Sequence, residues 1–93
     1  MHILLIQLAL NIPLSQSLKD KRRHIKSLKD KISHRFNASI AEVDYLDTWK
    51  KSVLAICMVS NDKSYLDKQY GLIESLVLEF PDLQIANISR EWL

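Results

Sequence analysis

Two stretches of the chain, residues 2–11 and 52–60, constrain its fold most, because both alternating sets of side chains in each of them are apolar. Successive side chains of a β-strand point to opposite faces of the sheet, so such a strand has apolar residues on both faces. Strands of this kind are typical of the middle of a sheet. We therefore expect residues 2–11 and 52–60 to form two central strands.

A helix is predicted between them, over residues 17–36. Its apolar side chains recur at spacings of three, four and seven, which is the pattern of one buried helix face; they are Leu18, Ile25, Leu28, Ile32 and Phe36. Ser17 is a suitable N-cap, and Asp20, three residues later, completes a capping box. We expect the helix to end near Phe36 and Asn37, since asparagine tolerates the left-handed conformation common at helix C-termini.

The rest of the chain predicts two further strands and a second helix. The alternation of residues 38–46 suits a strand at a sheet edge, and the short connection 47–50 makes it an antiparallel hairpin with residues 52–60. A second helix begins after Ser60 or Asn61 and stops at Pro81, and residues 83–93 form the last strand. The apolar face predicted for this helix consists of Leu66, Leu72, Ile73, Leu76, Val77 and Phe80.

The predicted order of elements is therefore β-α-β-β-α-β. Two right-handed crossover connections place both helices on the same face of a four-stranded antiparallel sheet. This is a ferredoxin-like α+β sandwich, and we expect it to be a single domain over residues 1–93. Its topology puts residues 2–11 and 52–60 in the middle of the sheet, as their two-sided apolar pattern requires.

Composition narrows the class of protein. Of the 93 residues, 47% are hydrophobic and 26% are charged, which is typical of a globular domain. Cys57 is the only cysteine, so no intrachain disulfide and no two-cysteine metal clip can form, and a reducing compartment fits. The apolar start lacks the basic region and cleavage site of a signal peptide, and it is too short to span a membrane. We therefore expect a cytoplasmic protein that makes no membrane contact.

A row of basic side chains follows one flank of the apolar stripe of the first helix: Lys19, Arg22, Arg23, Lys26 and Lys29. Residues 1–37 contain eight Lys or Arg and two Asp, a net charge of +6, whereas residues 38–93 contain five basic and nine acidic residues, a net charge of −4. An uneven distribution of this kind indicates an anionic partner at one end of the molecule.

The position of these cations has an energetic cost. The helix dipole disfavours a positive charge in the first turns by about 0.3–1 kcal/mol, and like-charge pairs such as Lys19–Arg22 cost roughly 0.2–0.5 kcal/mol each. A bound phosphate would offset this cost. The five residues are thus a candidate nucleic-acid-binding site, with RNA or a ribonucleoprotein as partner and phosphate-dominated contacts. A solvated helix face explains them equally well, and the sequence leaves both interpretations open.

The predicted fold leaves one apolar face of the central strands without a helix to cover it. Such a patch usually marks an interface. Face-to-face homodimerisation is its favoured use. An alternative function follows from it: a protein–protein interaction module without any nucleic-acid role, in which the basic flank is incidental.

Catalysis is not indicated by any motif. The single glycine, Gly71, lies in the second helix, so neither a phosphate-cradling loop nor a nucleophile elbow is present. His24 and His34, ten residues apart, are interpreted as surface residues rather than metal ligands. We therefore expect a non-catalytic protein without a cofactor or metal, and rank a catalytic or small-molecule role third.

The polar and aromatic residues of the predicted hairpin have structural interpretations. Glu42, Asp44 and Asp47 are interpreted as solvated acids that discourage pairing at the sheet edge. Trp49 is expected to pack within the hairpin. Cys57, inside an apolar strand, is expected to be a small buried hydrophobic residue.

Three stretches, SLKDKRRHIKSL, RFNASIAEVDYLDTW and VSND, resemble the YlxP-like family of small bacterial domains of unknown function. The resemblance runs from end to end, with the motifs in the same order. It implies the ferredoxin-like fold and a cytoplasmic location, and the family's gene neighbourhood suggests a connection with RNA or the ribosome. It implies no catalytic residue. The motif positions are Ser17, Leu18, Lys19, Lys21, Arg22, Arg23, Asn37, Glu42, Asp47 and Trp49.

Overall fold

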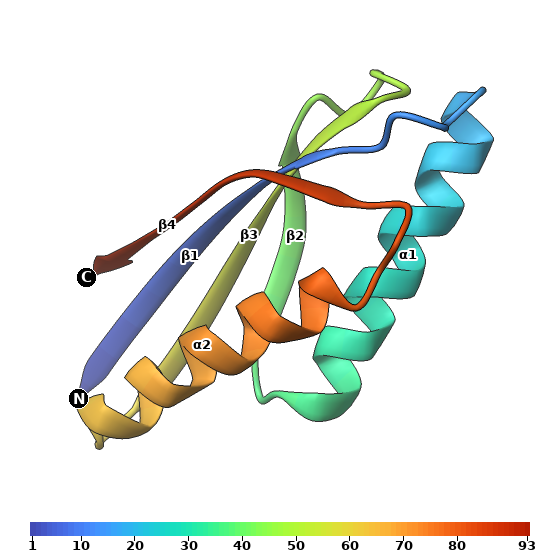
Figure 1. Cartoon of the computed structure of the whole chain (residues 1–93). Helices are drawn as coiled ribbons and strands as arrows, with labels where there is room; N and C mark the ends of the chain where they lie inside the picture. The colour runs from blue at the N-terminus through green and yellow to red at the C-terminus, as the bar shows by residue number, and fades with distance from the viewer.

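The computed structural model describes residues 1–93 and has the predicted order of elements (Figure 1). These are β1 (His2–Asn11), α1 (Leu18–Arg35), β2 (Ser39–Asp44), β3 (Lys51–Ser60), α2 (Lys63–Leu78) and β4 (Gln84–Trp92).

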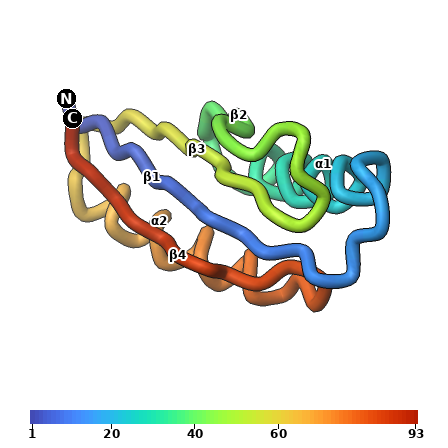
Figure 2. Tube along the Cα trace, turned by 90° about the horizontal axis from the view of Figure 1, so that it is seen from above, coloured from blue at the N-terminus to red at the C-terminus, as the bar shows by residue number.

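The four strands form one antiparallel sheet in the order β2-β3-β1-β4, and Figure 2 shows them side by side in this order. The prediction that β1 and β3 are central is confirmed, and so is the ferredoxin-like α+β fold. One side-chain set of each central strand is buried against the two helices. The other set, which includes Leu5 and Ala55, is covered by no helix and stays partly exposed.

A single core cluster lies between the sheet and the helices. The strands supply Leu4, Ile6, Leu8, Leu10, Leu54, Ile56 and Met58, and the helices supply Ile25, Leu28, Ile32, Leu66, Ile73, Leu76 and Val77. Burial of each such side chain contributes about 1.5–3 kcal/mol relative to exposure, so this layer is the main source of stability. It also fixes which side of each helix faces solvent.

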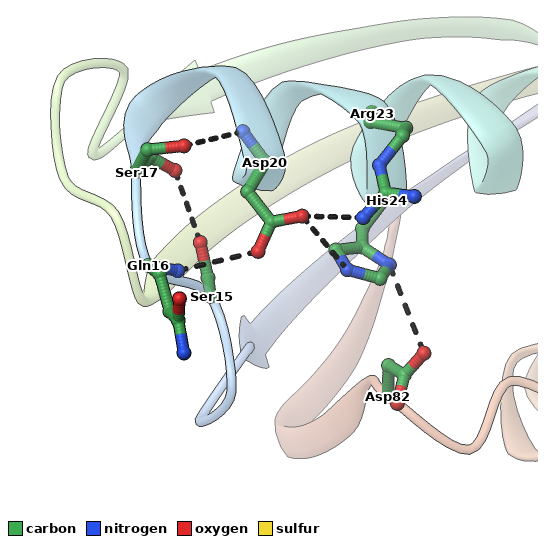
Figure 3. Close-up of polar contacts among 7 residues, drawn as sticks. All are labelled: Ser15, Gln16, Ser17, Asp20, Arg23, His24 and Asp82. Carbon is green, nitrogen blue, oxygen red and sulfur yellow. Dashed lines mark hydrogen bonds and ion pairs between the residues drawn. The ribbon is translucent and has the colours of Figure 1, made fainter.

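The N-terminus of α1 has the predicted cap in a modified form (Figure 3). The Ser17 hydroxyl accepts a hydrogen bond from the Asp20 backbone N–H at 3.0 Å. The Asp20 carboxylate accepts in return from the Gln16 N–H at 3.2 Å, one residue before the capping residue.

The left-handed conformation predicted at Asn37 is wrong. The helix ends at Phe36, whose φ of −129° is extended, and Tyr45 is the only non-glycine residue with a positive φ. The Phe36 side chain belongs to the core. We attribute the extended end to this burial, which directs the chain straight into β2.

The predicted start and apolar face of α2 also need correction. Asp62, not Ser60 or Asn61, is the N-cap, and its carboxylate accepts from the Tyr65 N–H at 3.3 Å. Leu72 was expected on the apolar face but is 53% exposed. It precedes the buried Ile73, so its side chain is rotated by about 100° around the helix.

The edge strand β2 is shorter than residues 38–46, because the chain turns sharply at its end. The register against β3 shifts between Glu42 and Asp44, and Tyr45 then adopts a φ of 58°. Ala41 and Val43 are both exposed, and Tyr45 lies outside the strand.

The molecule is elongated, with extents of 42 × 22 × 20 Å. Both chain ends lie side by side at one end (Figures 1 and 2), where the Leu93 N–H donates to the Ile3 carbonyl at 2.9 Å. The start of α1 and the β2–β3 connection lie at the other end. Neither helix has the length and apolar character needed to cross a membrane.

Candidate nucleic-acid interface

Four of the five basic residues predicted as a site come together on the solvent-facing side of α1. Lys19, Arg22, Arg23 and Lys26 are exposed, and their spacing of three and four residues places them next to one another along the helix. With Ser17 and Asp20, they line an open pocket of about 540 Å³. Lys29, the fifth basic residue, is half-buried and does not line this pocket.

The charges of this basic flank are only partly compensated. Arg23 pairs with Asp20 one turn before it, and Lys26 pairs with Asp30 one turn after it, the latter at 2.8 Å. Lys19, Arg22 and Lys29 have no acidic side chain within 4.0 Å. Of the four residues that line the pocket, Lys19 and Arg22 therefore carry the uncompensated positive charge.

Both acidic partners are held in their ionised form. The hydrogen bond from Arg23, and after it the one from the Gln16 backbone N–H, lowers the pKa of the Asp20 carboxyl below its ordinary value. The hydrogen bond from Lys26 lowers the pKa of Asp30 in the same way. Each acid thus stays negative to a lower pH than an aspartate without such a partner.

His24 lies on the opposite edge of α1, toward the α2–β4 connection (Figure 3). Its Nε2 atom is 3.6 Å from the Asp20 carboxylate and its Nδ1 atom is 4.0 Å from that of Asp82. The His24 side chain is 21% exposed, so it is less accessible than a free surface residue. No group of three or more His, Cys, Asp or Glu side chains is arranged to hold a metal ion.

Lys21 is the residue that the sequence-based prediction missed. Its side chain is fully buried, and its Nζ atom donates to the Tyr45 carbonyl at 2.7 Å. Spacing supplied a signal, since Lys21 falls on the apolar stripe between Leu18 and Ile25 at intervals of three and four. A lysine there must bury its charge against a partner.

That partner is Glu42, whose interpretation as a solvated acid is wrong. Its Oε2 atom lies 2.7 Å from the Lys21 ammonium and accepts a hydrogen bond from the Ser52 hydroxyl at 2.6 Å. Glu42 is opposite Leu54 of β3, which is buried in the core, so both side chains point toward the helices. Every buried side-chain nitrogen and oxygen has a hydrogen-bond partner.

The β2–β3 connection beside this network is exposed, although packing was predicted for it. Trp49 is 51% exposed, so the prediction that its ring packs within the hairpin is wrong. Tyr45 and Leu46 are 44% and 55% exposed. Cys57 on β3 is also only half-buried, because its side chain lies on the sheet face that no helix covers.

That open face carries the other predicted interface. Its apolar side chains come from the three strands β1, β2 and β3, and they are Ile3, Leu5, Ala9, Ala41, Val53, Ala55, Cys57 and Val59. The face contains no aromatic side chain on β1 or β3. Polar residues of β4 border it: Asn87, Ser89 and Glu91.

Comparison with known proteins gives the family. A family model described as "Protein of unknown function (DUF503)" matches residues 3–90, which include both the basic flank and the β2–β3 connection. The chain belongs to this family. It is also 30% identical, over 76 residues, to a Bacillus subtilis (strain 168) protein described as "Uncharacterized protein YlxP", with 82% of this chain and 83% of the relative covered. The resemblance to the YlxP-like family is therefore confirmed, and neither description names an activity.

Proposed function

We propose that this member of the DUF503 family is a non-catalytic protein that binds RNA, free or within a ribonucleoprotein, through phosphate contacts along α1. The contact residues are Lys19, Arg22, Arg23 and Lys26, with Lys29 at the margin of the surface. The observation that carries the proposal is that Lys19 and Arg22 are exposed, adjacent and without an acidic partner in the first turns of a helix.

Helix electrostatics favour an anion at this place. The first turns of a helix carry a partial positive charge, and two uncompensated cations there repel it and each other. A phosphate group beside Lys19 and Arg22 would relieve both repulsions and accept charge-assisted hydrogen bonds, against repulsion from the Asp20 carboxylate that lines the same pocket. Structural stability alone would favour acidic side chains at Lys19 and Arg22.

The expected mode of binding is electrostatic rather than base-specific. RNA-recognition motifs with this topology stack bases on aromatic residues of their central strands. The open face of β1 and β3 has none, so the phosphates of the RNA would supply most of the affinity. Four phosphate contacts on a single strand predict a slope of about −3 for log K against log salt concentration.

The proposed setting is the cytoplasm. The only cysteine, Cys57, is a free thiol, which fits a reducing compartment. The resemblance to the YlxP-like family implies the same location.

A fluorescence-anisotropy titration of a labelled oligouridylate over a salt series tests RNA binding. We expect Lys19→Glu/Arg22→Glu to weaken binding at least tenfold at about 100 mM salt. The slope of log K against log salt concentration should become shallower by about 1.4, because two phosphate contacts are lost and each contributes about 0.7. Lys31→Glu/Lys68→Glu is the control, because it changes the net charge equally at two exposed lysines outside the pocket. Failure of the wild-type protein to bind at about 50 mM salt, or equal losses in both variants, would contradict the proposal.

The open sheet face supports a second candidate function, homodimerisation. Its central strands have 10 residues each, so the face measures roughly 33 Å along the strands and roughly 19 Å across four of them. Two such faces would bury about 1,200 Å² in total, which is above the minimum of about 1,000 Å² for a specific interface. The face is mostly apolar, with the exposed Gln7 at its centre opposite Ala55 and polar residues along β4, and such a mixed surface is typical of non-obligate interfaces.

Light scattering coupled to size-exclusion chromatography tests this second candidate. We expect a dimer that Ala55→Glu converts to a monomer, because the substitution places a charge at the centre of the face. A wild-type protein that stays monomeric at high concentration would remove the candidate and leave the RNA-binding proposal unaffected.

A further inference from the structure

The β2–β3 connection presents apolar and aromatic side chains to solvent next to the basic flank. Trp49, Tyr45 and Leu46 are each between 44% and 55% exposed. Figures 1 and 2 both show this connection beside the first half of α1, at the end of the molecule away from the chain termini. Exposed rings and uncompensated cations thus share one end of the fold.

Three hydrogen bonds hold the connection in a fixed position. The Tyr45 carbonyl accepts from the Lys21 ammonium at 2.7 Å and from the Thr48 N–H at 3.1 Å. The Lys50 carbonyl accepts from the Ile12 N–H at 2.9 Å, which attaches the connection to the segment leading into α1. The backbone on both sides of Trp49 is therefore held beside the start of α1 without a ligand.

The Trp49 ring has no cation or aromatic partner, a property that it shares with the exposed Tyr65 and the buried or half-buried Phe36 and Phe80. The Tyr45 ring lies 5.8 Å from the Lys51 ammonium. The rings of Tyr70 and Trp92 are each 4.8 Å from a cation. Trp49 combines the largest ring type with about half of its surface free, which is what a base needs for stacking.

We propose that Trp49 stacks on an unpaired base of a single-stranded RNA whose phosphates contact Lys19 and Arg22. This inference rests on the proposed RNA-binding function and deepens it, because it names single-stranded RNA as the ligand class. In a duplex, neighbouring bases cover both faces of each base, so only an unpaired base can stack on the ring. The exposed acids Asp44 and Asp47 repel the phosphates of the strand but not the uncharged base, so the proposed contact involves the base alone while the phosphates lie on the α1 side.

The emission of Trp49 gives a direct test. The chain has two tryptophans, so Trp92→Phe leaves Trp49 as the only indole. The probe is an oligouridylate of about 12 nucleotides, within the usual site size, and the same strand annealed to oligoadenylate is the duplex control. We expect the single strand to quench Trp49 emission with the same concentration dependence as anisotropy, and the duplex to leave it unchanged.

Substitution of the ring gives an independent measure. We expect Trp49→Ala to weaken binding of the oligouridylate between about 5-fold and about 150-fold, with an unchanged salt slope, because no phosphate contact is lost. Trp49→Phe should bind more tightly than Trp49→Ala, because a phenyl ring can still stack on a base. A purely structural role of Trp49 in the loop does not predict this difference in affinity. Tyr65→Ala is the matched control, since Tyr65 is 43% exposed on the first turn of α2, at the other end of the molecule (Figure 1), and should leave affinity unchanged.

The outcomes separate this inference from the proposed function. The stacking contact alone would be overturned by two results: RNA leaves Trp49 emission unchanged, and Trp49→Ala binds RNA with wild-type affinity. The proposed function would stand in that case if binding still depends on salt and is still weakened by Lys19→Glu/Arg22→Glu. Equal quenching by the duplex would overturn the assignment to single strands. Absence of any RNA binding would overturn both the proposed function and the stacking contact.

Discussion

Lys21 and Glu42 join the first helix to the edge strand through an ion pair of 2.7 Å whose lysine side chain has no solvent exposure. The Tyr45 carbonyl and the Ser52 hydroxyl complete the hydrogen bonding of this pair. A buried charge is tolerated only while it is paired, so removal of one member has a larger effect than removal of both. This pair also fixes the β2–β3 connection, because the same ammonium group holds the Tyr45 carbonyl.

We expect Glu42→Leu to lower the free energy of unfolding by about 3–5 kcal/mol, because it leaves the Lys21 ammonium buried without a counter-charge. The double variant Lys21→Met/Glu42→Leu should recover most of this loss, since it removes both charges at similar volume. Urea unfolding monitored by circular dichroism measures both values.

The control for this prediction is the exposed ion pair Arg90–Asp67, whose side chains are 43% and 47% exposed. Its loss in Asp67→Ala should cost less than about 1 kcal/mol. A double variant at positions 21 and 42 that is no more stable than Glu42→Leu would show that the pair is not coupled as its geometry implies.

Charge reversal on the basic flank should raise stability while it weakens RNA binding. Lys19→Glu/Arg22→Glu places acids near the helix N-terminus and creates i,i+4 pairs with Arg23 and Lys26, which together favour folding by about 1 kcal/mol. Differential scanning calorimetry should show a melting temperature higher by about 4–8 °C.

The opposite end of α1 supplies the control. Lys31→Glu/Arg35→Glu reverses charge where the dipole favours cations, and it breaks the 3.6 Å ion pair between Arg35 and Glu79, so this variant should melt at a lower temperature. A lower melting temperature in Lys19→Glu/Arg22→Glu would instead mean that the flank contributes to stability, and the argument for a bound phosphate would lose its energetic basis.

The Asp20 carboxylate should make stability depend on pH in the acidic range. Its pKa is lowered in the folded state, first by the Arg23 hydrogen bond and then by the Gln16 N–H. Because the folded pKa lies below the unfolded one, the stabilisation is fully present above the unfolded pKa, near 4, and is lost as pH falls through the folded pKa.

Asp20→Asn should therefore be less stable than wild type at pH 7, and the difference should narrow below about pH 4. Carboxyl-carbon NMR titration measures the shift directly, and Arg23→Ala should return the pKa of Asp20 toward its ordinary value without changing that of Asp30. A pKa of Asp20 that stays low in Arg23→Ala would assign the shift to the backbone N–H instead.

Cys57 reports on the open sheet face, because its side chain lies there between Leu5 and Ser39 of the adjacent strands. If two copies pack through this face, the rate of Cys57 alkylation should fall as protein concentration rises. Ala55→Glu should make the rate independent of concentration. A concentration-independent rate in the wild type would agree with a monomer.

Most of the fold could be predicted because its main determinants are local patterns. The two-sided apolar character of β1 and β3 is sufficient to place them in the centre, and the topology follows from the order of elements. The errors lie at element ends, where distant contacts decide. The core position of Phe36 fixes how α1 ends, and the capping side chain of Asp62 fixes how α2 begins.

The candidate site could be predicted only in part, for the same reason. Helical spacing alone brings Lys19, Arg22, Arg23 and Lys26 together. The direction of Glu42 depends on its register opposite Leu54, and the exposure of Trp49 depends on a turn that begins at the left-handed Tyr45. No local signal in the sequence specifies a positive φ at a tyrosine.

The adjacent chain ends have a practical consequence for attachment to a surface. A linker at either terminus leaves the molecule from the end that is away from both α1's first turns and the β2–β3 connection. Immobilisation through a terminal tag would thus attach each copy at the end away from the candidate RNA surface, which stays accessible to the solution. Single-molecule and biosensor experiments can use this attachment without redesign of the chain.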